Sequence, residues 1–209
     1  MKGFYVGLVT LSALLLSTAA GAAEVGFKSG IVKGRVTIAG SPTRDVVVSI
    51  EGVAAESAKA RLALMRSKGA VMDQRDNKFL PPVLAVVVGT KVTFPNNDKS
   101  WHNVYSKGGA MDFDLGLYQP GKSRNVTFDK AGVFRILCNV HPNMEAYIVV
   151  KEQPFFSMAD KGGNYRIDGV PLGSYRVTVW HPELGTAEAG VQLVRDGQVS
   201  DINFDLKKK

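Results

Sequence analysis

The chain has few residues of the types that usually build metal clusters and disulfide frameworks. Among its 209 residues are one cysteine and three histidines. A single thiol has no intramolecular disulfide partner, so a domain held together by disulfides is excluded. Beyond the N-terminus, no apolar run reaches the roughly 20 residues that a membrane-spanning helix needs. A lone thiol that an exported chain retains points instead to reactivity or metal binding.

The N-terminal segment predicts export. Residues 1–23, "MKGFYVGLVTLSALLLSTAAGAA", combine a basic start, an apolar run and small residues before a cleavage point near Ala22 or Ala23. This order is typical of a signal peptide and predicts a periplasmic or otherwise exported protein with no transmembrane segment after processing. The alternative is a membrane anchor, but the apolar run from about Phe4 to Leu16 is short for a bilayer span.

The charge balance is basic and gives a weak indication of partners. The net charge is +7, spread along the sequence. It favours a redox partner with an acidic docking surface, although a merely solvated surface explains it equally well. Basic and aromatic residues do not interleave as in a nucleic-acid groove, so we expect no nucleic-acid partner.

The hydrophobic pattern predicts an all-β fold. Short runs rich in valine, isoleucine and aromatic residues, such as "RNVTF", "AYIVV" and "SYRVTVW", alternate with glycine, asparagine and proline turns. Such patterning is typical of β-sandwiches and barrels. Residues 54–69, "AAESAKARLALMRSKG", are the exception and predict a short linking helix that ends at a glycine. Ala58, Leu62 and Met65 are expected on one side of it.

The cysteine opens a segment with regular spacing of metal-binding residue types. In "CNVHPNM", Cys138, His141 and Met144 follow one another at intervals of three residues. Alternation in "VFRILC" places Phe134, Ile136 and the cysteine on one face of a strand, so we expect the thiol at the strand's inner end. A tight loop and a further strand, "MEAYIVVK", follow.

A fourth candidate ligand lies upstream. In "KVTFPNNDKSWHNVYS", a strand ends near Phe94, a polar turn follows, and His102 opens the next strand. A thiolate, two imidazoles and a thioether form the soft ligand set of a blue-copper electron-transfer site, whereas structural zinc sites favour more thiolates or histidines. Each residue alone has a structural explanation, as a buried histidine, a core thiol or a space-filling methionine. Together and in this order they predict copper.

Two stretches resemble a known family. "CNVHPNM" is similar to the Cys-x-x-His-x-x-Met ligand loop of amicyanin-like cupredoxins, and "WHNVYS" resembles the His-Asn-Val stretch that carries their first histidine ligand. The similarity covers roughly Val71 to Lys151 and extends to periplasmic cupredoxins of the methylamine-utilisation type. It implies one type 1 copper as the cofactor. The ligands it implies are His102, Cys138, His141 and the axial Met144.

The same resemblance implies roles for neighbouring residues. Asn103 would tie the two ligand loops together. The edge of His141 would lie near the surface as the route for electrons, and Pro142 and Asn143 would help to shape the docking surface. Lys99 and Trp101 stand unusually close to the first histidine, which leaves the polarity around the site open.

The remaining sequence suggests a second sandwich that is interrupted by the first. "IVKGRVTIAGSPTRDVVVSIEG" supplies two strands, and the segment after the copper region supplies about five more. Both resemble successive halves of a carboxypeptidase regulatory-like (transthyretin-like) domain, with the cupredoxin inserted between them. The expected order is a signal peptide (1–23), a first host part (24–53), the linking helix (54–69), the cupredoxin domain (70–151) and a second host part (152–209).

Some residues of the second host part allow two interpretations. His181 precedes a proline at a strand end, where we expect a structural or surface role rather than a metal-binding one. Tyr165, Tyr175 and Trp180 could form a carbohydrate-stacking face, but they alternate with polar residues as core residues of strands do. We therefore expect them in the core.

The function predicted from these features is one-electron transfer. A mononuclear type 1 copper protein would carry single electrons between periplasmic redox partners and would not be an enzyme. A copper reductase would need a second centre with several histidines, and a dinuclear electron-transfer centre would need two cysteines. Two alternatives stay open: a copper carrier or storage protein, and a structural or carbohydrate-binding module.

Overall fold

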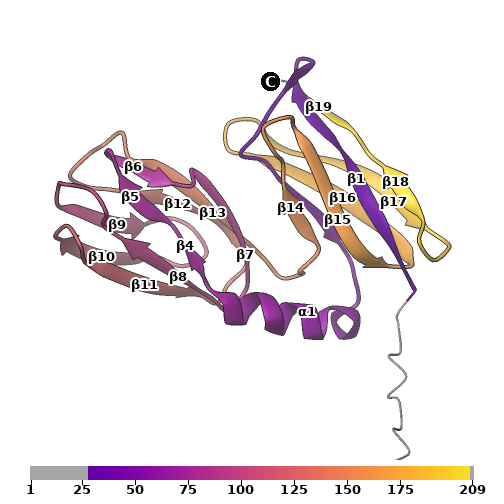
Figure 1. Ribbon diagram of the computed structural model, residues 1–209, viewed down its shortest axis with the longest axis horizontal. Helices are drawn as coiled ribbons and strands as arrows, with labels where there is room; N and C mark the ends of the chain where they lie inside the picture. Colours follow the sequence, from indigo (N-terminus) through magenta and orange to yellow (C-terminus); the bar gives the residue numbers. More distant parts are fainter. Residues whose placement is uncertain (1–27, 208–209) are drawn as a thin grey trace, which may run out of the picture.

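Two β-sandwiches lie beside each other and are joined by helix α1 (Ala55–Lys68), which runs along the base of both (Figure 1). The computed structural model describes residues 28–207, so the expected signal peptide lies outside the described residues. None of the helices in the described range is long and apolar enough to span a membrane. The all-β prediction with one short helix is confirmed.

The host sandwich is built from strands that precede and follow the inserted one. Its first sheet has the order β15-β1-β18, and β2 and β19 also pair with β1. These strands are β1 (Ser29–Ile38), β2 (Ser41–Pro42), β15 (Asn164–Pro171), β18 (Val199–Asp201) and β19 (Phe204–Leu206). Its second sheet has the order β14-β3-β16-β17. These strands are β3 (Val47–Glu51), β14 (Phe156–Met158), β16 (Gly173–His181) and β17 (Gly185–Leu193).

One hydrophobic core joins the two host segments. Val36 and Val48, from before the insertion, are fully buried with Val177 and Val179, from after it. The strand pairing agrees, because β1 pairs with β15 and β3 pairs with β16, both antiparallel. Neither segment could bury this core alone. The chain therefore follows a nested path, with one sandwich inserted into the other.

The inserted sandwich carries His102 and the segment from Cys138 to Met144. Its larger sheet has the order β10-β9-β12-β13-β7, and a smaller sheet has the order β11-β8-β4. The larger sheet contains β7 (Val83–Val87), β9 (His102–Ser106), β10 (Phe113–Tyr118), β12 (Gly132–Leu137) and β13 (Glu145–Lys151). The smaller sheet contains β4 (Ala70–Val71), β8 (Thr90–Pro95) and β11 (Ser123–Phe128), and β5 (Asp73–Arg75) pairs with β6 (Lys78–Leu80) in a hairpin.

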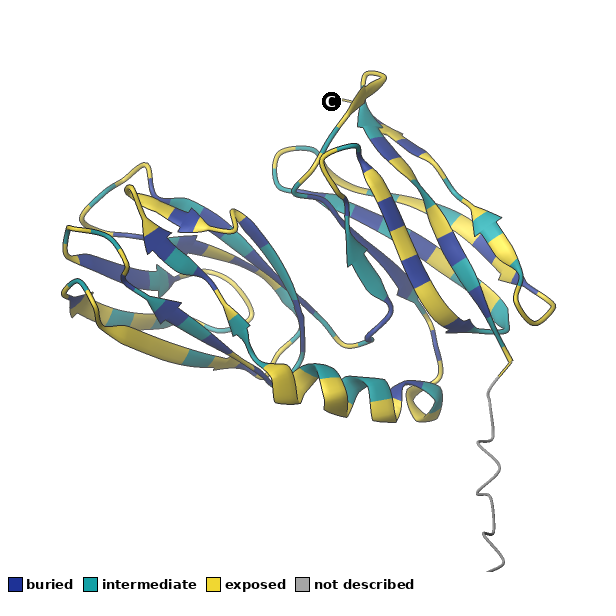
Figure 2. Ribbon diagram, in the orientation of Figure 1, coloured by how far each residue is buried: buried dark blue, intermediate teal, exposed yellow. Residues whose placement is uncertain are grey.

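Alternation along the strands produces the core of this sandwich. Buried and exposed bands alternate along several strands of both sandwiches (Figure 2). In β12, Phe134 and Ile136 are fully buried, and Cys138 beyond the strand end is 4% exposed. The expected inner face of this strand is thus confirmed. Phe94 and Phe128 from the smaller sheet complete the core.

Helix α1 begins and ends close to the predicted bounds. Ala58 is fully buried and Leu62 and Met65 are partly buried, as expected for residues on one side of it. Gly69 ends the helix with φ of 61°, and its N–H donates to the carbonyl of Arg66. A residue without a Cβ adopts this left-handed backbone at little cost, which explains the glycine.

The two sandwiches also touch directly. Trp180 of β16 packs edge-on against Tyr147 of β13, with ring centroids 5.5 Å apart. Lys151 and Glu51 form an ion pair across the same junction. The expectation that Trp180 lies in the host core is therefore wrong, because its side chain fills the junction instead.

The other host residues lie as expected. Tyr165 is 4% exposed in the host core, and Tyr175 packs partly buried against that core. The Nδ1 atom of His181 accepts hydrogen bonds from the N–H groups of Glu183 and Leu184. Burial lowers the pKa of His181 and keeps the ring neutral, which fits a structural role in this turn.

Candidate metal centre

Three strand ends meet at the end of the inserted sandwich that is remote from the junction. His102 is the first residue of β9, and Cys138 directly follows β12. These strands are neighbours, with Leu137 opposite Tyr105. His141 lies in the loop from β12 to β13. The sheet order thus brings together side chains that are 36 or more positions apart in the sequence.

The three donor atoms converge on one point. The Nδ1 atoms of His102 and His141 are 3.0 Å apart, and the Sγ atom of Cys138 is 3.9 Å from Nδ1 of His102. All three donor atoms lie within 4.8 Å of one another. Imidazole nitrogens bind metals at about 2 Å, so two of them can share one ion only when they lie within about 4 Å. The donor set fits a single metal ion.

The centre is buried except on one side. His102 is fully buried and Cys138 is 4% exposed, whereas His141 is partly exposed. Met144 is fully buried, and its N–H donates to the carbonyl of His141 at 2.9 Å, which closes the loop into a turn. Pro142 is exposed next to His141. Only one imidazole of the donor set therefore borders solvent.

A carboxylate fixes the first histidine. Nε2 of His102 donates to Oδ2 of Asp98 at 2.9 Å, and the Asp98 side chain is only 9% exposed. With the proton held on Nε2, the lone pair of Nδ1 is free for a metal. Burial alone would raise the pKa of Asp98. Hydrogen bonds from the N–H of Asn77, from His102 and from the N–H of Lys99 outweigh it and lower the pKa to about 2.

Sequence reasoning missed this carboxylate. Asp98 stands four residues before His102 in "NNDKSWH", and this spacing was the available signal. A turn places the side chain, because the N–H of Asp98 donates to Oδ1 of Asn96 and the amide of Asn96 donates to the carbonyl of Ser100. Aspartate and asparagine in polar turns often bond to the local backbone, so the sequence did not single out this residue.

Asn103 joins the two ligand segments. Its Oδ1 accepts a hydrogen bond from the N–H of Asn139 at 2.7 Å, and its Nδ2 donates to Asp114 at 2.8 Å. Asn139 directly follows Cys138. Asn103 is only 4% exposed, so these hydrogen bonds compete little with water. The side chain lies where the family resemblance places a link between the loops.

A second buried network supports the strand opposite His102. Tyr118 of β10 faces His102 in the strand register, and its hydroxyl donates to the carbonyl of Phe94 at 3.0 Å. The amide of Gln74 donates to the same hydroxyl. Burial raises the pKa of Tyr118 to about 12, so it stays protonated as a donor. Nothing in the local sequence pattern indicated this contact, because its partners lie on three different strands.

Comparison with known proteins defines the class of this sandwich. Residues 66–151 match the family model of copper-binding proteins of the plastocyanin/azurin family. This part of the chain is a cupredoxin domain, and its cofactor is copper. The donor set described above, with one thiolate and two imidazole nitrogens around one point, is chemically suited to that ion.

The chain is also similar to individual proteins over part of its length. The chain is 29% identical over 77 residues to amicyanin-alpha of Methylorubrum extorquens. The matched segment is 35% of this chain and 65% of that protein. Among solved structures, it is similar to a copper-containing nitrite reductase from Thermus scotoductus, with 28% identity, a TM-score of 0.39, and coverage of 40% of this chain and 22% of the enzyme. It is also similar to a variant of reduced amicyanin, with 25% identity, a TM-score of 0.38, and coverage of 50% and 98%.

Proposed function

We propose that this chain is an exported type 1 copper protein that carries single electrons between redox partners. The residues that would hold the copper are His102, Cys138, His141 and Met144. The observation that carries the proposal is the convergence of a thiol and two imidazole nitrogens, with donor atoms within 4.8 Å of one another. Copper in such a site supplies one-electron redox chemistry.

The protein's own residues hold the donors in place. Cys138 and Met144 belong to the same hydrophobic cluster as the core phenylalanines, which restricts their movement. Asp98 orients one imidazole and Asn103 holds the loop that follows the cysteine. A ligand set that moves little between oxidation states favours fast electron transfer, because little reorganisation accompanies each step.

His141 provides the route to a partner. Its ring contacts that of His102, with centroids 4.7 Å apart, and it is the donor residue that borders solvent. Exposed Pro142 and Asn143 flank it and would form part of the docking surface. We infer that electrons enter and leave through this imidazole edge.

We propose a carrier rather than an enzyme. The nitrite reductase that resembles this chain is an enzyme, but the chain covers only 22% of its length. Within residues 28–207, one group of three metal-binding side chains is found, and the cupredoxin site uses it. A protein with one redox centre can take up and pass on one electron, which is the task of a carrier.

The wider setting is also part of the proposal. The N-terminal sequence pattern supports the periplasm, and the basic charge balance supports redox partners with acidic surfaces. The host sandwich would be a carboxypeptidase regulatory-like domain, on the strength of its sequence pattern and its two-sheet architecture. Such modules occur in many settings, so the host adds little to the functional argument.

Copper loading of the purified chain without its N-terminal segment tests the proposal. Adding Cu(II) should produce an intense visible band from thiolate-to-copper charge transfer, and the colour should bleach and return over repeated redox cycles. Cys138→Ser should remove the band, whereas His181→Asn, which alters a histidine outside the site, should retain it. A coloured Cys138→Ser protein would overturn the ligand assignment. Tight copper binding without reversible redox cycling would favour a copper carrier or storage protein instead.

A further inference from the structure

A groove of about 330 Å³ opens at the copper end of the cupredoxin sandwich. Its walls come from the turn before β9, the end of β10 and the start of β11, and include Trp101, Leu117, Lys122 and Arg124. We call it the tryptophan groove. None of these four residues belongs to the donor set, so the groove is a feature separate from the metal site.

Strand register places this groove next to the ligands. Trp101 directly precedes His102, and Tyr118, which forms the groove floor, lies opposite His102 in the β9–β10 pairing. Ser123 at the start of β11 pairs with Pro95 at the end of β8, so this strand also begins at the copper end. A protein seated in the groove would therefore lie against the same end of the sandwich as the two histidine ligands.

The apolar part of the groove is unusually exposed. Trp101 is 51% exposed and Leu117 is 53% exposed. Neighbouring large apolar side chains on the surface are a common mark of a protein–protein interface, and tryptophan is among the residues that contribute most to binding there. The groove therefore offers an apolar anchor point.

The charged part of the groove has one sign. Lys122 and Arg124 are both exposed, and the lining contains no carboxylate. Among the described residues, neither cation has an ion-pair partner. The guanidinium of Arg124 lies over the ring of Tyr118, 5.9 Å from its centroid. This contact pre-orients the arginine while leaving its charge available. An acidic surface is the complementary partner.

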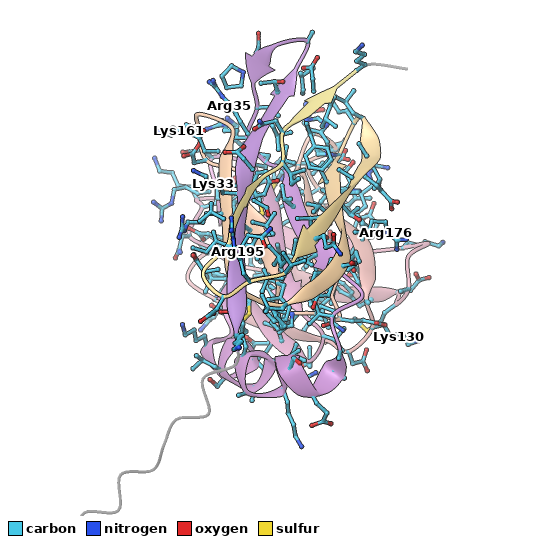
Figure 3. The ribbon with its side chains drawn as sticks, turned by 90° about the vertical axis from the view of Figure 1, so that its right-hand side faces the viewer. Lys33, Arg35, Lys130, Lys161, Arg176 and Arg195 are labelled. Atoms are coloured by element: carbon cyan, nitrogen blue, oxygen red, sulfur yellow. The ribbon has the colours of Figure 1, made fainter. Side chains whose placement is uncertain are left out.

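Two exposed cations on the host sandwich are paired with carboxylates. Figure 3 shows Lys33 and Arg35 along one side of the host and Arg176 on the opposite side. Lys33 pairs with Asp201 at 3.9 Å, and Arg176 pairs with Glu188 at 3.4 Å. The charges of Lys33 and Arg176 are therefore partly neutralised by neighbours, whereas Lys122 and Arg124 have no ion-pair partner among the described residues.

We propose that the tryptophan groove is the docking surface for an acidic redox protein. Carboxylates of the partner contact Lys122 and Arg124, and an apolar side chain packs on Trp101. The inference rests on the proposed electron-transfer function and adds where the partner binds and what its surface carries. Docking there brings the partner's redox centre to the end of the sandwich where His141 borders solvent.

Electron-transfer kinetics test the charged half of the proposal. The probe is reduced cytochrome b5, an acidic haem protein, mixed with the Cu(II) protein at low and high ionic strength. Lys122→Glu/Arg124→Glu should slow the second-order reaction by roughly tenfold or more at low ionic strength, and salt should remove most of this difference. The matched control is Lys91→Glu/Lys130→Glu, which makes the same charge change at exposed positions outside the groove.

The outcomes separate this inference from the proposed function. If the control variant Lys91→Glu/Lys130→Glu slows electron transfer as much as Lys122→Glu/Arg124→Glu, the groove variant, only net charge matters. This result would overturn the groove as the docking surface. Equal rates for the groove variant and the unmodified protein would overturn it as well. If the unmodified protein shows no visible band and takes no electron from cytochrome b5 or from small reductants, the proposed function itself fails. Unchanged visible spectra in both double variants would show that the copper site is intact.

A second measurement tests the apolar half. Backbone amide signals of the Cu(I) protein, followed by NMR during titration with cytochrome b5, should shift around Leu117 and Lys122. Trp101→Ala should weaken binding by about tenfold or more, which is the range expected for an anchoring tryptophan. Shifts confined to the host sandwich, or unchanged affinity in Trp101→Ala, would contradict the proposal.

Discussion

Replacing Asp98 by asparagine should raise the reduction potential of the copper site. The carboxylate lies 2.9 Å from Nε2 of His102, on the side of the ring opposite the proposed ligand atom Nδ1. A negative charge there stabilises Cu(II) more than Cu(I), so its removal favours the reduced state. The asparagine amide oxygen can still accept the Nε2 proton, which preserves the orientation of the ring.

The size of the shift follows from Coulomb's law. With a metal about 2 Å from Nδ1, the carboxylate charge would act over about 7 Å, and an effective dielectric constant of about 20 gives about 2 kcal/mol. A tenfold change in a one-electron equilibrium corresponds to about 59 mV, so the expected rise is about 100 mV. The Asp98 side chain is only 9% exposed, and solvent screening should therefore not remove most of this effect.

Protein-film or solution voltammetry of the copper-loaded variant measures the shift. Asp129→Asn is the matched control, since it removes one exposed carboxylate of the same domain and should change the potential by less than about 20 mV at moderate salt. Asp98→Asn also loses one acceptor for a backbone N–H and should lower the free energy of unfolding by about 1 kcal/mol. A potential that stays within about 30 mV of the original, or falls, would refute the electrostatic argument.

Three further predictions address other parts of the molecule. Met144→Leu should still bind copper but with a raised potential by voltammetry, and complete loss of binding would argue against an axial role. Asn103→Ala, which breaks the hydrogen bond to Asn139, should weaken copper binding by roughly 10- to 100-fold in a competitive titration, and unchanged affinity would contradict its linking role. Because burial lowers the pKa of His181, the unfolded chain binds more protons below about pH 6.5, so the free energy of unfolding of the copper-free protein should fall as the pH drops below that value. His181→Gln should flatten this pH dependence. If the variant keeps the pH profile of the unmodified chain, His181 is not its source.

Much of the fold could be predicted because the relevant signals are local. Alternation in "VFRILC" predicted the buried face of β12, since side chains point to opposite sides of a strand at successive positions. The glycine at the end of "AAESAKARLALMRSKG" predicted the end of α1, since only a residue without a Cβ adopts that backbone conformation at little cost. Such features depend on a few consecutive residues and can be read directly from them.

Features that depend on contacts between distant segments could not be predicted. The cover of Trp180 is an example, because alternation in β16 places it on the face opposite Val177 and Val179 but does not show what packs on that face. The cover is supplied by Tyr147 of the other sandwich and not by the host core. The expectation of a core position was therefore wrong, and the side chain is partly buried at the junction.

The candidate site shows the same division. The spacing within "CNVHPNM" identified three donor types within one loop, and His102 followed from its place at a strand start. Asp98 was missed because its contact with His102 depends on the shape of a polar turn, which the Asn96 side chain fixes. Ligand residues are recognisable by chemical type, whereas the residues that orient them share their types with ordinary turns.

The nested chain path also explains why the copper end is accessible. The chain enters the inserted sandwich after α1, where Arg66 donates to the carbonyl of Val88 at 2.6 Å, and it leaves through Lys151, whose carbonyl accepts from the N–H of Val88 at 2.9 Å. Entry and exit thus lie close together, as an insertion that leaves its host folded requires. The host packs on the face of β13 that carries Tyr147 and Lys151, whereas Cys138 and Met144 belong to the core on the other side of this strand. A redox partner can therefore approach His141 without displacing the host sandwich.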